Sequence, residues 1–239
     1  MNATSHKLQS CNVALDEWGN TSISRYVWLR SVLDFSLTVI CLAVFSPVIL
    51  GAMLLVRLTS RGPAIYTQKR AGLNGKTFTI YKIRSMYLNS EPNGAKWCVV
   101  GDPRVTPIGR LLRATHIDEM PQLINILRGD MSLIGPRPER PEIVTQLERV
   151  FPDYGRRLVV RPGLTGLAQV LQAPDTDVAS VRRKLNYDIY YVERLSPGLD
   201  LRILFATVLL FLCIPKPLIA TLFQFPYERV PAAQPAIES

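Results

Sequence analysis

The most continuous run of hydrophobic residues in the chain lies near its N-terminus and predicts a membrane segment. From Phe35 to Val56 no residue carries a charge. A run of about 22 apolar residues is long enough for a helix to cross the hydrocarbon core of a bilayer. A signal peptide fits poorly because the run starts late and no small-residue cleavage site follows before Arg57.

The path of this segment through the bilayer is left open by two features. Arginines flank it on both sides, so the bias of positive charge toward the cytoplasm gives no direction. Near its middle stands Pro47, which has no N–H to donate to the carbonyl of Ala43, while the hydroxyl of Ser46 can bond to a freed carbonyl. Residues 25–60 therefore predict either a spanning helix with a mild kink or a re-entrant helix that returns to the same leaflet.

After the membrane segment the hydrophobic runs become shorter, and they predict a small α+β domain over residues 61–202. The stretch AIYTQKRAGLNGKTFTIYKIRSM predicts a β-hairpin, because strand-forming residues flank an Asn-Gly turn. Lys82 and Arg84 stand two residues apart near the end of the second strand. We therefore expect both side chains on the same side of the hairpin.

Amphipathic helices are predicted in the rest of this domain. IGRLLRATHIDEMPQLINILRGD predicts a helix in two pieces, with Pro121 in the first turn of the second piece. PEIVTQLERVFPDYGRRL and DVASVRRKLNYDIYYVERLS predict one helix each, and RPGLTG between them predicts a turn. The stretch NSEPNGAKWCVVGDPRVTP is rich in Gly, Pro, Asn and Asp, which predicts a loop.

The two ends of the chain differ in character. Residues 1–24 are polar and irregular, and we predict a flexible extension. The apolar stretch from Ile203 to Pro215 is short for a membrane span, and prolines and aromatic residues follow it. We predict that residues 203–239 lie at the membrane interface, and a buried core helix is the alternative.

Composition narrows the class of protein. The 239 residues are 48% hydrophobic and 20% charged, which is typical of a folded chain. A net charge of +9 indicates an anionic partner, such as nucleic acid, anionic lipid or a phosphorylated substrate. The four cysteines are scattered and form no CxxC motif, which favours free thiols over zinc. The absence of GxxxxGK[ST] and GxGxxG argues against a P-loop or Rossmann nucleotide site.

The pair Asp118 and Glu119 is the strongest candidate for chemistry. Helix capping alone can explain two acidic residues at a helix start. Three arginines change this interpretation: Arg113 precedes the pair, and Arg137 and Arg161 follow in stiff Pro/Gly-rich loops. Arginine forks fit phosphate oxygens two at a time. One carboxylate can then hold Mg²⁺ while the other attacks phosphorus, so the pattern predicts phosphoryl transfer.

These stretches together resemble the bacterial sugar transferase family, monotopic phosphoglycosyl transferases that start lipid-linked glycan assembly. The resemblance covers roughly residues 27–205 in the family's order. Leu167 departs from the Trp that the family often has, and Ser85 departs from the common Thr. The chain is expected to be a short form without additional transmembrane helices. The matching segments are the Ser46-Pro47 helix, GLNGKTFTIYKIRSM, DPRVTPIGRLLR, HIDEMPQLINILRGDMSLIGPRPERPE, VRPGLTGLAQV and YDIYYVERLSPGLDLRIL.

The resemblance implies a mechanism and a site. The membrane helix would be re-entrant, broken at Ser46 and Pro47, with both ends in the cytoplasm. Asp118 would be the nucleophile that takes a sugar phosphate from a UDP-sugar, releases UMP, and passes the sugar phosphate to undecaprenyl phosphate. Glu119 would bind Mg²⁺. The residues expected to bind substrate or phosphate are Lys82, Arg84, Arg113, Arg137, Arg161 and Asp188.

The expected location is the cytoplasmic face of the bacterial inner membrane, with membrane lipid as a partner. No nucleic acid is expected, because the chain has no aromatic-interleaved basic strand or recognition helix. The sequence does not choose between a monomer and a homodimer. Two rival functions stay open: a membrane phosphohydrolase that uses water as acceptor, and a non-catalytic membrane adaptor that would tolerate Asp118→Asn.

Overall fold

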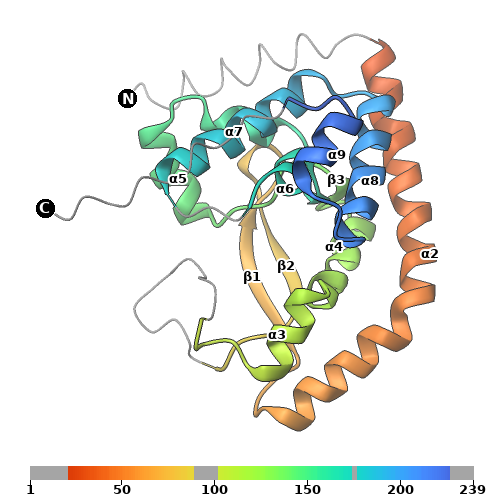
Figure 1. Cartoon of the computed structure of the whole chain (residues 1–239), viewed down its shortest axis with the longest axis vertical. Coiled ribbons are helices and arrows are strands. Elements are labelled where there is room, and N and C mark those ends of the chain that lie inside the picture. Colours follow the sequence, from red (N-terminus) through yellow and green to blue (C-terminus); the bar gives the residue numbers. More distant parts are fainter. Residues whose placement is uncertain (1–20, 89–101, 174–176, 227–239) are drawn as a thin grey trace, which may run out of the picture.

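The computed structural model describes residues 21–88, 102–173 and 177–226. Over these ranges the chain is a mixed α+β structure with one long N-terminal helix, small sheets and several shorter helices. Figure 1 shows the long helix α2 running along one side of the other elements. Most of the predicted N-terminal extension, much of the predicted loop, Cys11, Cys98 and residues 227–239 lie outside the described residues.

Helix α2 (Thr21–Thr59) contains the whole uncharged run from Phe35 to Val56. It begins four residues before, and ends one residue before, the bounds of the predicted segment 25–60. By length and composition its part from Arg25 to Thr59 is sufficient to cross a membrane. Pro47 lies inside the helix, and the hydroxyl of Ser46 donates a 3.2 Å hydrogen bond to the carbonyl of Ala43. This is the carbonyl that the proline leaves without an N–H partner, as predicted. Figure 1 shows that α2 bends and passes beneath α3.

The outward face of α2 is apolar and exposed. Trp28, Leu33 and Leu50 are each more than half exposed, whereas Ala52 and Val56 are buried against the domain. An apolar strip of this length on a protein surface marks a site of contact with a membrane or partner. Because the strip belongs to an uncharged helix of membrane-spanning length, it supports membrane association.

The predicted β-hairpin is confirmed. Strands β1 (Ile65–Ala71) and β2 (Thr77–Ile83) pair antiparallel and are joined by the short helix η1 (Leu73–Gly75). Asn74 and Gly75 have φ values of 53° and 74° in this turn. Both residue types adopt positive φ at low cost, so the Asn-Gly pair fixes the turn.

The helix predicted in two pieces is also confirmed. Helix α3 (Pro107–Ala114) is followed by the 3₁₀-helix η2 (Ile117–Gln122), which continues directly into α4 (Leu123–Leu127). The hydroxyl of Thr106 caps α3 by accepting a 2.9 Å hydrogen bond from the N–H of Gly109. His116 takes a left-handed conformation with φ 56°, and this reversal separates α3 from η2.

The RPGLTG segment, predicted as a turn, contains a short strand. Strand β4 (Gly163–Thr165) pairs parallel with β3 (Ser132–Ile134). A strand of three residues leaves almost no alternation of polar and apolar positions in the sequence. The Pro-Gly pair at its start therefore gave the only visible signal, and the pairing with β3 comes from the tertiary structure.

The helix predicted over PEIVTQLERVFPDYGRRL is in fact two elements. Helix α5 (Pro141–Val150) is capped by Phe151, and the 3₁₀-helix η3 (Tyr154–Val159) follows. Phe151 is extended, with φ −123° and ψ 98°. This conformation is expected of a residue before proline, and Pro152 cannot continue the hydrogen bonding of α5.

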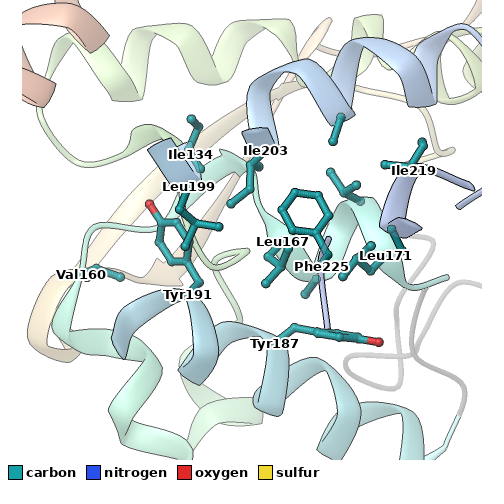
Figure 2. Packing of buried hydrophobic residues seen from close by; sticks show 14 of the residues in the cluster. Ile134, Val160, Leu167, Leu171, Tyr187, Tyr191, Leu199, Ile203, Ile219 and Phe225 are labelled. Atoms are coloured by element: carbon teal, nitrogen blue, oxygen red, sulfur yellow. The ribbon is translucent and has the colours of Figure 1, made fainter. Parts of the chain in front are cut away.

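The main hydrophobic core joins the C-terminal half of the domain. It is built by α6 (Leu167–Leu171), α7 (Val178–Glu193), α8 (Pro197–Phe211) and α9 (Lys216–Leu222), which confirms the helix predicted over DVASVRRKLNYDIYYVERLS. In Figure 2, Phe225 from the end of this region lies next to Leu167, and Tyr187 of α7 belongs to the same cluster.

The apolar C-terminal stretch combines features of both predicted alternatives. Ile203 and Ala206 of α8 are fully buried in the core, as a core helix would be. Phe205, Val208 and Phe211 on the same helix are each more than half exposed, as an interfacial helix would be. Contact of this exposed face with lipid stays a prediction.

The first testable prediction concerns the packing of α3 against the hairpin end. A Cβ added at Gly109 would lie 2.0 Å from the carbonyl oxygen of Ser85, so Gly109→Ala must push this backbone away. We expect Gly109→Ala to lower the free energy of unfolding by about 2 kcal/mol. In α8, Gly198 has no atom within 4 Å of the same position. Gly198→Ala is therefore the matched control, and thermal unfolding in detergent should show it unchanged or slightly stabilised.

Candidate active site

The carboxylate pair lies in η2 and is positioned by the hairpin. Asp118 and Glu119 occupy the first turn of η2, which leads directly into α4. The fully buried Asn125 of α4 donates a 2.7 Å hydrogen bond to the carbonyl of Thr79 and accepts one of 3.2 Å from the N–H of Tyr81. These bonds fix α4 and η2 along β2. As a result Lys82, the next residue of β2, meets η2.

Glu119 is held between two cations. The Nζ atom of Lys82 lies 2.8 Å from Oε1 of Glu119. The guanidinium of Arg137 donates to both carboxylate oxygens, at 3.1 Å to Oε2. Burial alone would raise the pKa of Glu119, but Arg137 and Lys82 outweigh it and hold the pKa well below its usual range. Glu119 is therefore ionised at neutral pH.

Asp118 is in the opposite electrostatic state. Its side chain is buried, and no described residue donates a hydrogen bond to its carboxylate. Burial, with the neighbouring charge of Glu119, raises the pKa of Asp118 to about 6. The chain thus places an unpaired, partly desolvated carboxylate beside a fully paired one. Strongly perturbed ionisation of this kind is typical of functional sites.

The loop that carries Arg137 is held by close packing of two backbones. The N–H of Gly163 donates a 2.9 Å hydrogen bond to the carbonyl of Pro136, and the N–H of Gly135 donates one of 2.8 Å to that of Thr165. A Cβ at Gly163 would lie only 2.1 Å from the nitrogen of Gly135. Position 163 therefore requires glycine. The close contact fixes Gly135, and with it Arg137 two residues later in the same loop.

Arg157 supports the Arg137 loop from inside the protein and was not predicted. It is 1% exposed, and its guanidinium donates a 2.7 Å hydrogen bond to the carbonyl of Arg137. The same guanidinium contacts Asp188 at 2.8 Å. Asp188, predicted to bind substrate or phosphate, therefore pairs with Arg157 and reaches the site only through it. Nothing in the local sequence marks this pair, because its members are separated by 31 residues.

A second group of ion pairs, which is partly buried, lies behind the hairpin turn. Glu139 pairs with Lys184 of α7 and lies 3.9 Å from Arg70 of β1. The carbonyl of Glu139 also accepts a 2.8 Å hydrogen bond from the N–H of Ala71. These contacts join the Arg137 loop to β1 and α7. Sequence reasoning missed all three charged residues, since each looks like an ordinary surface charge.

Of the remaining predicted residues, Arg113 lies near the carboxylates, whereas Arg161 and Arg84 contact other parts of the chain. Arg113 lies near the pair, where its charge opposes the rise in the pKa of Asp118, and its Nε atom donates a 2.7 Å hydrogen bond to Ser85. Lys82, Arg113 and Arg137 are therefore brought to the carboxylates as predicted. Arg161 contacts Ser31 of α2 at 3.0 Å instead.

Arg84 is also placed differently from its prediction. Its guanidinium donates to the carbonyl of Arg61 at 2.6 Å, to that of Ser60 at 3.0 Å, and to the Ser60 hydroxyl at 2.7 Å. Strand β2 ends at Ile83, so the alternation that would keep Arg84 on the same side as Lys82 stops before it. The arginine instead holds the C-terminal end of α2.

The fold and the site define a membrane-associated domain built around a carboxylate pair among partly buried cations. The chain belongs to the bacterial sugar transferase family, whose sequence profile matches residues 25–213. The expected family is confirmed by this match.

Curated relatives are similar over most of this chain. The UDP-N-acetylgalactosamine-undecaprenyl-phosphate N-acetylgalactosaminephosphotransferase of Aeromonas hydrophila is 43% identical over 183 residues, which are 77% of this chain and 43% of that protein. The UDP-glucose:undecaprenyl-phosphate glucose-1-phosphate transferase of Caulobacter vibrioides is 42% identical, covering 75% and 68%. The exopolysaccharide production protein PSS of Rhizobium leguminosarum is 39% identical, covering 75% and 93%. The chain thus spans less than half the length of the Aeromonas relative.

The second prediction concerns how much the ionised side chain of Asp118 lowers the stability of the folded protein. Its pKa is about 6 in the folded protein and 3.8 without the fold, so ionisation opposes folding and stability falls as pH rises between these values. Asp118→Asn removes this penalty. We expect the metal-free variant to exceed wild type in the free energy of unfolding by up to about 3 kcal/mol at pH 8, with the gain disappearing toward pH 4.

Urea unfolding in detergent with EDTA, repeated from pH 4 to 8, measures this difference. Asp153→Asn is the control, because Asp153 pairs with Arg182 on an exposed surface and its loss should give no gain at pH 8. A variant at position 118 that is no more stable than wild type at pH 8 would contradict the account of Asp118.

The third prediction concerns the buried pair behind Arg137. Asp188→Asn leaves the guanidinium of Arg157 buried without its counter-ion. We expect the free energy of unfolding to fall by about 3 kcal/mol, because removing one member of a buried ion pair strands the other charge. Glu193→Gln breaks the exposed pair with Arg156 and should cost less than about 1 kcal/mol in the same thermal unfolding assay. Equal losses in the two variants would show that burial does not set the value of the Arg157 pair.

Proposed function

We propose that this chain is a phosphoglycosyl transferase that moves a sugar 1-phosphate from a UDP-sugar to undecaprenyl phosphate through a covalent aspartyl intermediate. One observation carries the proposal: two adjacent carboxylates are in opposite states, with Asp118 unpaired and Glu119 held by Lys82 and Arg137. The names of the relatives support the reaction, since two of them name a UDP-sugar and undecaprenyl phosphate.

In the first step the carboxylate of Asp118 attacks the β-phosphorus of the UDP-sugar. A bond forms between phosphorus and a carboxylate oxygen, the bond from phosphorus to the bridging oxygen breaks, and UMP leaves with the electron pair. Burial leaves this carboxylate poorly solvated, and the absence of a hydrogen-bond donor from the described residues leaves its oxygens available to react. Arg137, Arg113 and Lys82 supply the positive charge that the diphosphate needs.

In the second step an oxygen of undecaprenyl phosphate attacks the same phosphorus. The acyl phosphate bond breaks, and Asp118 is released as a carboxylate beside a polyprenyl-diphosphate sugar. Neither step requires a proton to be removed, because both attacking oxygens are already anionic. The site therefore needs cations and positioning more than it needs a general base.

A magnesium ion is part of this proposal. The described residues contain no group of three or more His, Cys, Asp or Glu side chains that could hold a metal by themselves. Mg²⁺ commonly uses one or two carboxylates together with substrate phosphates, so a carboxylate pair fits it. Glu119 would hold the ion after exchanging a contact with Lys82 or Arg137. When bound, the ion would neutralise diphosphate charge and stabilise the leaving UMP.

The membrane helix is proposed to be re-entrant, with the domain on the cytoplasmic face of the bacterial inner membrane. Pro47 lies within the apolar run of α2, which stays one continuous helix there instead of breaking as expected. Figure 1 shows that α2 bends, and its exposed apolar residues leave one face free for lipid. Arginines at both ends of the run suit a helix whose ends lie in the same anionic headgroup layer. This position brings a soluble nucleotide and a lipid phosphate to one site.

The fourth prediction is the direct test. With Mg²⁺, undecaprenyl phosphate and a panel that includes UDP-N-acetylgalactosamine and UDP-glucose, the wild-type protein should release UMP from at least one donor. Asp118→Asn should lower this rate by about a thousandfold or more, because the nucleophile is lost. Incubation of wild type without lipid should give a sugar-phosphate adduct, detected by intact-protein mass spectrometry.

Asp153→Asn makes the same chemical change on an exposed surface and should keep full activity. Lipid-independent release of free sugar phosphate would instead favour a phosphohydrolase. Full activity of Asp118→Asn would remove Asp118 as nucleophile. A membrane adaptor would release no UMP from any donor and would keep its cellular role in Asp118→Asn.

A further inference from the structure

A cavity of about 200 Å³ separates the N-terminal part of α2 from the domain. Its lining is mixed: the polar residues are Arg30, Ser31, Asp34, Asn74, Ser132 and Arg161. The apolar residues include Val27, Leu73 and Leu195. A cavity whose lining holds both arginines and apolar side chains suits a ligand with a charged head and a hydrocarbon chain.

Arg161 is the cation in this cavity that has most capacity to bind a ligand. Its guanidinium donates a 3.0 Å hydrogen bond to the hydroxyl of Ser31, and no carboxylate of the described residues forms an ion pair with it. A guanidinium has five N–H donors in a planar fork. Most of these donors are therefore left for a ligand, and the fork matches two oxygens of a phosphate.

The one acidic side chain in the cavity wall is already engaged. Asp34 accepts a 2.5 Å hydrogen bond from the hydroxyl of Ser132 and one of 3.4 Å from the N–H of Leu133. Arg30 donates a 2.6 Å hydrogen bond to the same hydroxyl and lies 3.3 Å from Asp200. These contacts hold Arg30 and Asp34 together at β3, so the guanidinium of Arg161 sets the charge offered to a ligand.

The cavity lies beside the start of the uncharged run of α2. Asp34 is the last charged residue before the uncharged run that starts at Phe35. Trp28 and Leu33, on the same turns of α2 as the cavity wall, are more than half exposed. Aromatic and basic residues at the boundary of an apolar helix are typical of the membrane interface. A lipid phosphate is therefore the anion most concentrated near this cavity.

We propose that this cavity binds the phosphate group of a membrane amphiphile, with Arg161 as the phosphate ligand and the apolar lining residues against the first part of the hydrocarbon chain. Two lipids carry this chemistry: the polyprenyl phosphate acceptor and an anionic membrane phospholipid. Assignment to the acceptor rests on the proposed function, whereas lipid binding itself does not.

The position of the cavity relative to the carboxylate pair supports a link to the reaction. A Cβ added at Gly135 would lie 2.6 Å from the carbonyl of Arg161, so the two loops touch through their backbones. Two residues after Gly135, Arg137 binds Glu119. A lipid phosphate held by Arg161 would thus lie across a single packed wall from the candidate active site.

The fifth prediction is tested by lipid binding, independently of catalysis. The full chain is placed in phosphatidylcholine nanodiscs that contain small amounts of undecaprenyl phosphate or phosphatidylglycerol, and native mass spectrometry counts the retained lipid. Arg161→Gln should lower retention of at least one of these lipids by tenfold or more. Val27→Trp narrows the cavity without changing any charge and should lower the same retention, while thermal unfolding checks that both variants are folded.

Arg25→Gln is the matched control, because Arg25 is exposed on the same helix and lies outside the cavity wall. Loss of undecaprenyl phosphate in Arg161→Gln, with a raised KM for this lipid and an unchanged KM for the UDP-sugar, identifies the acceptor. Loss of phosphatidylglycerol alone identifies a phospholipid site. Unchanged retention of both lipids, or an equal loss in Arg25→Gln, overturns the proposal. Failure of the proposed function would appear separately, as absence of UMP release with lipid binding intact.

Discussion

The contact of Glu119 with Lys82 and Arg137 is the constraint on which the site depends. It joins three segments that are distant in sequence: the hairpin, η2 and the loop between β3 and α5. Glu119 needs these partners, because its side chain is only 13% exposed and a largely buried charge without a counter-ion is costly. The supporting contacts, from Asn125 behind η2 to Arg157 behind Arg137, serve to keep these three charges in register.

The same principle explains how an apolar helix stays attached to a polar domain. In a membrane the hydrophobic effect does not drive an apolar helix onto a protein, because lipid is equally apolar. Polar contacts therefore help to orient α2 against the domain. They lie at its two ends: Arg30 and Asp34 bond to β3, and Arg84 bonds to the carbonyls at the C-terminal end. The apolar outer face between these ends stays exposed. The helix is thereby fixed relative to the carboxylate pair while its other side can contact lipid.

The parts of the structure that depend on local signals could be predicted from the sequence. The Asn-Gly turn, the proline in α2 with the hydroxyl of Ser46, and the placement of Asp118 at a helix start all follow from neighbouring residues. The pairings of Arg157 with Asp188 and of Arg161 with Ser31 join distant positions and leave no local pattern. The phosphate-binding roles expected of Arg84 and Asp188 were taken from motif positions, whereas the structure pairs Arg84 with the end of α2 and Asp188 with Arg157. Phosphate binding by Arg161 stays a prediction.

The contrast between the two carboxylates follows from their adjacency in the chain. Neighbouring residues in a helical turn point in different directions, so the cations that reach Glu119 do not pair with Asp118. The negative charge of Glu119 then adds to burial in raising the pKa of Asp118. The stabilised charge of Glu119 thus destabilises the ionised form of Asp118. A nucleophile that is poorly stabilised in the free protein has more to gain when phosphorus approaches, and this difference is what catalysis requires.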